Sequence, residues 1–594
     1  MAADGRKTLS LPAKADPDPS RHYCKRELLE KQLTSMKEVR RPYEPEIYEI
    51  AGLAQPNRSR YVAAMSSRSN RAGRRANKLY DGHAIRSFRT LTGGMYSGMS
   101  SPNRPWFKFG FEDKDLASYQ PVKIWLEKAG EIVARMLNSS NFYSAAKLGY
   151  SEIGLFGTDA CVMTEALDWE TGLTYPVCFP QTFGEYWVAL NHKLEPDRLI
   201  RQQMMTVKQM VGAFVADRLD KRQMNWDRVS LQVQNAWDRG NYETEIPTYQ
   251  AIMPNEAHIP ERLDPAGMPW ESVKWEEGQS DKGMLLEEKG FWSQPFWAPR
   301  WEVASGDVYG FGPGHDALTD MRALQLQAKR KGEATDFAVK PPLMAPASLR
   351  IKFQPGSVTH AAAADQAQVK PIFQVDYRAI EVIGRDAAEL RDAVDESTYA
   401  RLFMAISSLD GSADRTIMEI SKREEEKLTQ LGPVIERVNN EKLGVALDRA
   451  FDIAARNAML PEPPEEIQDM PIEIDFVSIL AQAQRMIGMQ QTERALSFTA
   501  QLAQVDPRVS DNVDGDALMR DYWDRAGAPA LGLRDERERD ANRAAQAKQA
   551  QMEKAAAMAP AMAQGADAMQ TMAQTPVQGG QSTLFDSLMQ QPPI

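Results

Sequence analysis

The side chains that most often do chemistry are sparse in this sequence. Six histidines are spread over 594 residues, and none has the HExxH spacing that puts two imidazoles on one helical face. They are His22, His83, His192, His258, His315 and His360. Cys24, Cys161 and Cys178 form no CxxC pair and no Cys/His cluster, so we expect reduced thiols and no metal site.

Phosphate chemistry has little support either. The GxxxxGK[ST] motif is absent from the sequence, which excludes a P-loop packaging motor. The glycine-rich residues 310–314 include Pro313, which removes a backbone donor, and no lysine follows, so we interpret them as a turn leading into a helix. His315, Asp316 and Asp320 could form a small constellation, but both carboxylates also suit a helix N-terminus, and we favour that role.

Hydrolytic chemistry is the remaining possibility. The GxSxG elbow of serine hydrolases is absent. The acidic run Glu424-Glu425-Glu426 suggests a metal-dependent nuclease, but consecutive carboxylates on a helix point in different directions and more often form a solvated face. We therefore expect no catalytic residue, no metal and no cofactor, and we predict that the protein is not an enzyme.

The elements of the first half are predicted from periodicity. Residues 22–39 place Leu29, Leu33 and Met36 at helical spacing, and further helices are expected at 121–137 and 143–154. A helix that begins near residue 79 should stop at Gly93-Gly94 and lead to a short aromatic strand. Residues 158–305 mix short strands with Trp and Pro turns, which indicates an α+β region.

The second half is mainly helical, so the predicted fold class is α+β and predominantly helical. A helix over 316–337 and another over 380–407 flank a Pro-rich excursion. The apolar stripe of the second helix is Ile383, Ala387, Leu390 and Val394. The longest helical signal covers 416–460 with a kink at Gly432-Pro433, and a strand at 472–477 and further helices follow.

Composition bounds the class of protein. A hydrophobic fraction of 43% and a charged fraction of 26% are typical of a folded chain, and the length requires more than one packed region. The net charge of −11 argues against a surface that clamps nucleic acid. The N-terminus has no apolar segment of a signal peptide, so neither secretion nor membrane insertion is expected.

Five segments resemble the head-to-tail connecting (portal) proteins of podoviruses, the short-tailed bacteriophages. They are residues 80–109 (YDGHAIRSFRTLTGGMYSGMSSPNRPWFKF), 141–165 (NFYSAAKLGYSEIGLFGTDACVMTE), 308–346 (VYGFGPGHDALTDM onwards), 414–443 (DRTIMEISKREEEKL onwards) and 460–485 (LPEPPEEIQDMPIEIDFVSIL onwards). They occur in the family's order over about residues 22 to 540, which is most of the chain.

The resemblance implies a subunit with a wing, a stem, a clip and a crown that assembles into a ring. Its parts would be a flexible N-terminal arm (1–21), an α+β wing (22–312), a first stem helix (313–339), a clip (340–379), a second stem helix (380–407), a channel loop (408–416), a long wing helix and strand (417–475), crown helices (476–542) and a flexible Ala/Met/Gln-rich tail (543–594).

The implied function is that of a portal at one capsid vertex, through which double-stranded DNA is packaged and ejected. The implied partners are other copies in a ring of about twelve, the terminase large subunit, the tail adaptor and tail proteins, and the major capsid and scaffolding proteins, without a membrane. The protein would be assembled in the host cytoplasm and reside in the virion at the head–tail junction.

Candidate site residues follow from that layout. Those expected to border the DNA channel are Lys329, Arg330 and Lys331 on the first stem helix and Leu409, Asp410, Gly411, Ser412 and Arg415 in the loop. Those expected in the clip, where terminase and tail adaptor dock, are Arg350, Lys352 and Phe353. For the basic turn, a solvated helix end favoured by the helix dipole is the alternative role.

Two rival functions remain open from the sequence. A DNA-processing hydrolase would assemble its site from distant carboxylates and would show metal-dependent nuclease activity. A capsid scaffold or internal core protein would also suit long charged helices, but it would form no closed ring with a central hole.

Overall fold

The fold is described from a computed structural model. It describes residues 19–56, 79–113, 119–167, 172, 174–216, 224–260, 262, 264–277, 285–341, 343–344, 370–371, 377–407, 430–467, 470–477, 497–499, 501, 514–519, 539–550 and 552. The chain divides into two compact units, Met1–Gln501 and Leu502–Ile594. Nearly all of the described elements belong to the first unit.

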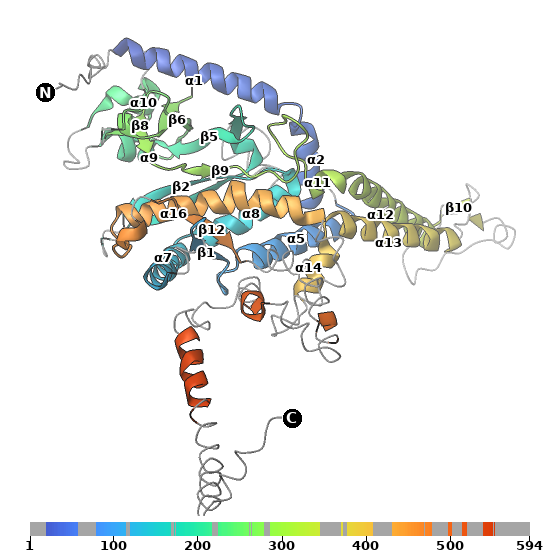
Figure 1. The fold of residues 1–594 in the computed structure, drawn as a ribbon. Helices are drawn as coiled ribbons and strands as arrows, with labels where there is room; N and C mark the ends of the chain where they lie inside the picture. Colours follow the sequence, from blue (N-terminus) through green and yellow to red (C-terminus); the bar gives the residue numbers. More distant parts are fainter. Residues whose placement is uncertain are drawn as a thin grey trace, which may run out of the picture. The chain divides into compact units, whose positions relative to one another are not determined.

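An antiparallel five-stranded sheet covered by a long helix forms one layer of the first unit. The strand order is β4 (Tyr186–Leu190), β5 (Pro196–Thr206), β6 (Glu245–Pro254), β7 (Trp270–Glu276) and β8 (Glu287–Phe291). Helix α1 (Pro19–Arg40) lies across the sheet (Figure 1) and buries the predicted stripe Leu29, Leu33 and Met36 against Trp187 and Trp275. The four- and three-residue steps of the stripe keep its members on one helical face.

A small lobe separates β5 from β6 along the chain. It contains α9 (Val207–Met210), the π turn η2 (Val211–Val215), the 3-10 turn η3 (Trp226–Arg228) and α10 (Leu231–Asp238). The Ser230 side chain caps α10 by accepting from the Val233 N–H at 3.4 Å. The lobe has its own small apolar core.

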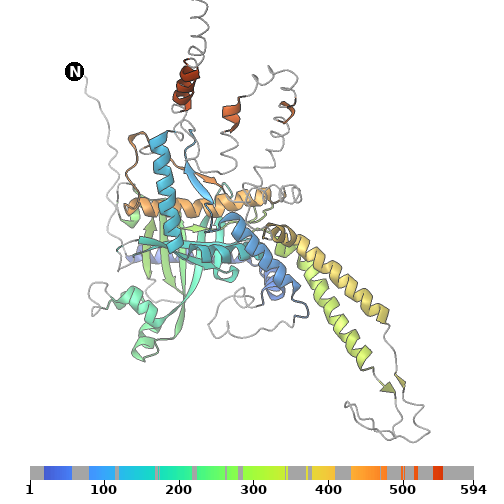
Figure 2. The same cartoon turned by 90° about the horizontal axis from the view of Figure 1, so that it is seen from below.

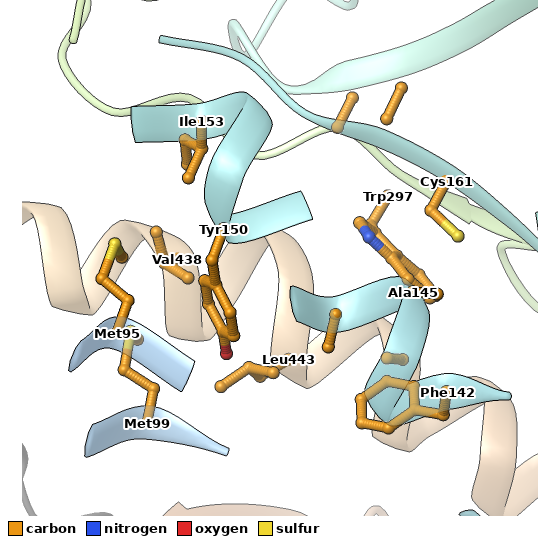
Figure 3. Packing of buried hydrophobic residues seen from close by; sticks show 14 of the residues in the cluster. Met95, Met99, Phe142, Ala145, Tyr150, Ile153, Cys161, Trp297, Val438 and Leu443 are labelled. Atoms are coloured by element: carbon orange, nitrogen blue, oxygen red, sulfur yellow. The ribbon is translucent and has the colours of Figure 1, made fainter. Parts of the chain in front are cut away.

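The main core lies between a three-stranded sheet and a group of helices. The sheet order is β3 (Thr174–Gln181), β2 (Ala160–Leu167) and β9 (Phe296–Trp297). The helices are α2 (Glu44–Ala54), α5 (His83–Met99), α7 (Gln120–Ser139), α8 (Phe142–Phe156) and a long helix that runs from residue 430 through the π segment η6 (Asn439–Gly444) into α16 (Val445–Arg456). Figure 3 shows Tyr150 of α8 between Met95, Val438 and Leu443.

A two-stranded antiparallel ladder joins distant parts of the chain. In it β1 (Phe107–Gly110) pairs with β12 (Glu473–Phe476), with Phe107 opposite Phe476. The Val477 N–H also donates to the Trp106 carbonyl at 3.0 Å. Both aromatic side chains of β1 are buried in the main core, which positions the chain that follows α16.

A helical hairpin extends from the main core (Figures 1 and 2). Helices α11 (Pro313–Asp316) and α12 (Leu318–Val339) lead outward, and α13 (Tyr377–Ser397) returns to α14 (Ala400–Ser407). At the far end, β10 (Leu343–Met344) pairs antiparallel with β11 (Lys370–Pro371). The hairpin therefore consists of two antiparallel helices closed by a short ladder.

The predicted α+β class with a predominance of helix is confirmed, as are the helices expected at 22–39, 121–137 and 143–154. The predicted helix stop at Gly93-Gly94 was wrong, because α5 continues to Met99. A side chain at Gly94 would overlap Phe403 of α14, whereas Gly93 has open space around it. Gly94 is thus needed for close helix packing and does not end the helix.

The helix predicted over 380–407 is in fact two helices. Thr398 and Tyr399 separate α13 from α14, and Tyr399 adopts the left-handed region with φ 52°. The break lets α14 turn from the hairpin onto α5, which periodicity alone did not indicate. The long helix is regular through Gly432-Pro433 over residues 430–438, and its irregular turn lies in η6.

Several predicted parts lie wholly or mostly outside the described residues. They are most of the arm predicted at 1–21, most of the clip at 340–379, the channel loop at 408–416, most of the crown and residues 553–594. Residues 19–21 of the predicted arm belong to α1. Residues 543–550 of the predicted tail are helical. In this second unit, Asp516 pairs with Arg539 at 3.3 Å and with Arg543 at 2.5 Å.

Candidate functional site

The hairpin begins at a tight glycine-rich turn. The Gly312 and Gly314 Cα atoms lie against backbone carbonyls of α8, so that an added Cβ would lie 2.8 Å from the Ile153 oxygen in the first case. The predicted turn leading into a helix is confirmed, because α11 begins at Pro313. The His315 Nδ1 accepts from the Gly312 N–H at 3.2 Å, and burial lowers the pKa of this imidazole below its ordinary value.

Apolar side chains hold the two helices of the hairpin together near its base. On α12 the buried residues are Leu318, Met321 and Leu324, and on α13 the buried apolar residues are Ala387 and Val394. Their spacings of three and seven residues place them on the facing side of each helix. Farther out, an added Cβ at Gly384 would lie 3.3 Å from the Lys331 Nζ, so Lys331 reaches across to α13.

Polar side chains tie the base of the hairpin to the segment that precedes α5. Asp81 accepts from Arg391 at 2.7 Å, across 310 residues of sequence. Gln325 accepts from the Tyr80 N–H at 2.8 Å and donates to the Asp81 carbonyl at 2.6 Å. Both hairpin helices are therefore joined to Asp81.

Two further contacts reinforce this base. Asp395 of α13 lies 2.9 Å from the His83 Nε2 and also contacts the Ser87 hydroxyl. Burial by itself would raise the pKa of Asp81, but the hydrogen bonds from Arg391 and from the His83 N–H hold that pKa below its ordinary value. The contact of Arg391 with Asp81 at the base of the hairpin therefore depends on an ionised Asp81 carboxylate.

The predicted cationic turn lies on α12 with its side chains exposed. Lys329 is 3.8 Å from Glu333 one turn later, and no pair closer than 4.0 Å is seen for Arg330 among the described residues. Asp316 and Asp320 occupy the first turns of α11 and α12, as expected. The other predicted residues, namely Leu409, Asp410, Gly411, Ser412, Arg415, Arg350, Lys352 and Phe353, lie outside the described part of the chain.

A fully buried ion pair fixes the long helix to the core behind the hairpin. Lys442, in η6, donates to Asp159 at 2.7 Å, with exposed side-chain fractions of 0% and 1%. The ammonium group also lies 4.4 Å from the centre of the Tyr150 ring. An added Cβ at Gly149 would overlap both charged groups, so glycine is required where α8 passes the pair.

Sequence reasoning missed the residues that anchor these elements. Asp81, Arg391 and Lys442 have no local motif, since each finds its partner hundreds of residues away. Gly94 was noticed but interpreted as a helix stop. The adjacent glycines gave no signal that distinguishes a packing contact from open space.

The described residues include no group of three or more His, Cys, Asp or Glu side chains placed to hold a metal ion. Cys161 and Cys178 are free thiols in the core, and burial raises the pKa of the Cys161 thiol. Over the same residues, we find no helix with the length and apolarity to cross a bilayer.

Comparison with known proteins gives consistent results. A family profile described as bacteriophage head to tail connecting protein matches residues 26–533. The portal protein of Salmonella phage epsilon15 is 36% identical over 547 residues, which cover 91% of this chain and 94% of that protein. The probable portal protein of Bordetella phage BPP-1 is 33% identical over 462 residues, which cover 77% of this chain and 80% of that protein.

Proposed function

This chain belongs to the bacteriophage head-to-tail connecting protein family, and we propose that its copies close into a ring of about twelve subunits around a DNA channel. It is a phage portal protein, a structural and non-enzymatic component of the virion that forms the head–tail connector. The ring would occupy one capsid vertex and would be assembled in the host cytoplasm before DNA is packaged.

The anchored hairpin is the observation that carries the ring proposal. In the proposed layout, α12 and α13 of the hairpin form the stem, the elements of residues 22–312 form the wing, and residues 476–542 form the crown. A channel wall must keep its position while DNA moves past it. The ties from Asp81 to Arg391 and Gln325 give the stem a fixed base.

Charge supports a channel in which DNA slides. With −11 per chain, about twelve copies carry a formal charge of roughly −130, which disfavours trapping of the duplex. We assign a guiding role on the wall to the basic turn formed by Lys329, Arg330 and Lys331. The loop residues Leu409, Asp410, Gly411, Ser412 and Arg415 would narrow the channel.

The guiding role has its own test. Replacing Lys329 and Lys331 by glutamine should preserve ring assembly, since both side chains are exposed, and should alter packaged DNA length or ejection rate. The matched control is Lys193→Gln, an exposed lysine in the turn between β4 and β5, outside the proposed stem and clip. Unchanged packaging and ejection in the double variant would contradict a channel role for these cations.

The far end of the hairpin is the proposed clip, where the terminase large subunit and later the tail adaptor bind. The β10–β11 ladder holds its two ends together, and Arg350, Lys352 and Phe353 belong to the segment between them. Replacing residues 345–369 by a short Gly/Ser turn should leave rings intact and abolish terminase binding. Rings that still bind terminase would refute the assignment.

End-on electron microscopy of the purified protein tests the central proposal. It should show an annulus with a hole wide enough for a DNA duplex, and phage heads should carry the protein at the tail vertex. A protein that stays monomeric at every concentration and is absent from that vertex would refute the proposal. A scaffold or core protein would likewise give no closed ring.

A further inference from the structure

Each helix of the hairpin carries a second stripe of side chains on the face turned away from its partner helix. On α12 these residues are Leu326, Arg330, Glu333 and Phe337, and on α13 they are Val382, Arg385 and Glu389. Glu333 follows the buried Leu324 by nine residues, which is two and a half helical turns. Each stripe has the alternating three- and four-residue spacing of a coiled-coil seam.

These outer stripes are exposed and partly apolar. Leu326 is 47% exposed, Phe337 47% and Val382 52%, and the four charged members are exposed as well. The ion pairs that these charged groups make within the chain are weak surface contacts, such as Arg385 with Glu381 at 3.5 Å. Large apolar side chains aligned along an outer seam indicate a surface that packs against another protein.

The order of the side chains matches between the two stripes. From the base of the hairpin outward, α12 presents Arg330, Glu333 and Phe337. In the same direction α13, which runs antiparallel, presents Glu389, Arg385 and Val382. Read outward from the base, the α12 stripe is basic, acidic and then apolar, and the α13 stripe is acidic, basic and then apolar. Each charge on one stripe therefore has an opposite charge at the same place on the other, and the two apolar side chains correspond.

One register aligns all three pairs. Gln325 and Arg391 both contact Asp81 at the base and Leu343 pairs with Pro371 at the far end, so Phe337 lies about level with residue 378, four residues from Val382. The two charged pairs are offset in the same direction by three and four residues. A shift of one hairpin by about 5 Å along its axis, at about 1.5 Å per residue, satisfies every pair. The same register brings Lys340 opposite Arg378, so the matched seam ends at Phe337.

We propose that the α12 stripe of one copy packs against the α13 stripe of a second copy. Two different surfaces meet in this contact, so it is heterologous. It closes a ring when the hairpins are tilted from the ring axis, because rotation about that axis moves no copy along it. The inference rests on the proposed ring and names the seam between its stems. It also assigns Arg330 to the subunit contact, and Lys331 reaches across to α13, which leaves Lys329 as the cation of that turn that can face DNA.

Charge reversal and exchange test the seam. Glu333→Arg or Arg385→Glu alone should raise the protein concentration needed for half-maximal ring formation at least tenfold, measured by mass photometry. The double variant, with both charges exchanged, should return within about threefold of wild type. Asp336→Arg, an exposed reversal on the same helix but on another face, is the matched control and should assemble normally.

Crosslinking provides a second measurement that does not depend on stability. Under mild oxidation, rings that carry Phe337→Cys and Val382→Cys together should give ladders of covalent oligomers, and each single variant should not. The two positions lie on outward faces of one hairpin, so a bond within one chain is excluded. Normal assembly of both single reversals, or rings of the double cysteine variant without ladders, would overturn the seam but not the ring. A wild-type protein that forms no ring would overturn the proposed function itself.

Discussion

The contact between Gly94 and Phe403 predicts opposite outcomes for two neighbouring alanine substitutions. Gly93→Ala places a methyl group in open space, whereas Gly94→Ala places it inside the van der Waals surface of Phe403 on α14. Alanine favours a helix interior over glycine by about 0.5–1 kcal/mol at either position. The difference between the two variants therefore isolates the packing contact.

The size of the effect follows from the overlap. Non-bonded carbons pack at about 3.5–4 Å, so α5 and α14 would have to separate by about an ångström to admit the methyl group. The Phe403 Cβ is itself among the overlapped atoms, so shortening that side chain does not make room. Overpacking of this kind costs about 1–3 kcal/mol, which outweighs the gain in helix propensity.

Hydrogen–deuterium exchange of peptides from α5 and α14 measures how often these two helices open locally. Gly94→Ala should speed exchange about 5- to 30-fold, corresponding to about 1–2 kcal/mol, and Gly93→Ala should slow it. Adding Phe403→Ala to Gly94→Ala should not restore protection. If Gly94→Ala protects α5 as well as Gly93→Ala does, the close approach of α5 and α14 is refuted.

Three further predictions concern ionisable groups. Lys442→Met should destabilise the long helix by about 3–5 kcal/mol, because it leaves the Asp159 carboxylate buried without a partner, and Asp159→Asn added to it should recover much of that loss in chemical denaturation. His315 has a lowered pKa, so the unfolded chain binds more protons just below pH 6.5 and stability should fall there as pH falls; His315→Asn should remove that slope from thermal unfolding curves. Asp81 has a lowered pKa, so its contribution to stability is fully present above pH 3.8 and is lost as pH falls through the lower pKa of the folded state. Asp81→Asn should abolish this acid-induced loss of protection from hydrogen exchange at the hairpin base, and it should speed exchange there at neutral pH.

Local patterns in the sequence predicted the elements that bury one continuous face. The stripe of Leu29, Leu33 and Met36 gave α1, because a four- and three-residue step determines which face packs. The same reasoning gave a helix where α13 lies, since Ala387 and Val394 are seven residues apart. Such apolar spacings lie within one segment, so the helix that they predict does not depend on contacts with distant parts of the chain.

Contacts between distant segments could not be predicted in this way. The left-handed turn at Tyr399 has no glycine or proline to indicate it, and it exists because α14 packs on α5. The joining of Asp81 to Arg391 likewise depends on where two helices meet in space. The order of the family's motifs indicated the hairpin between 313 and 407, whereas the residues that hold its base became apparent only from the three-dimensional arrangement.

The β1–β12 ladder has a consequence for how the chain folds during synthesis. Phe107 pairs with Phe476, so the aromatic strand leaves the ribosome long before its partner exists. At about 5–20 residues per second, the wait is roughly 20 to 70 s. During that interval Phe107 and Phe109 are without the strand that completes their environment, and an unpaired aromatic edge invites aggregation. Nascent chains stalled before residue 473 should therefore depend on host chaperones far more than chains released at full length.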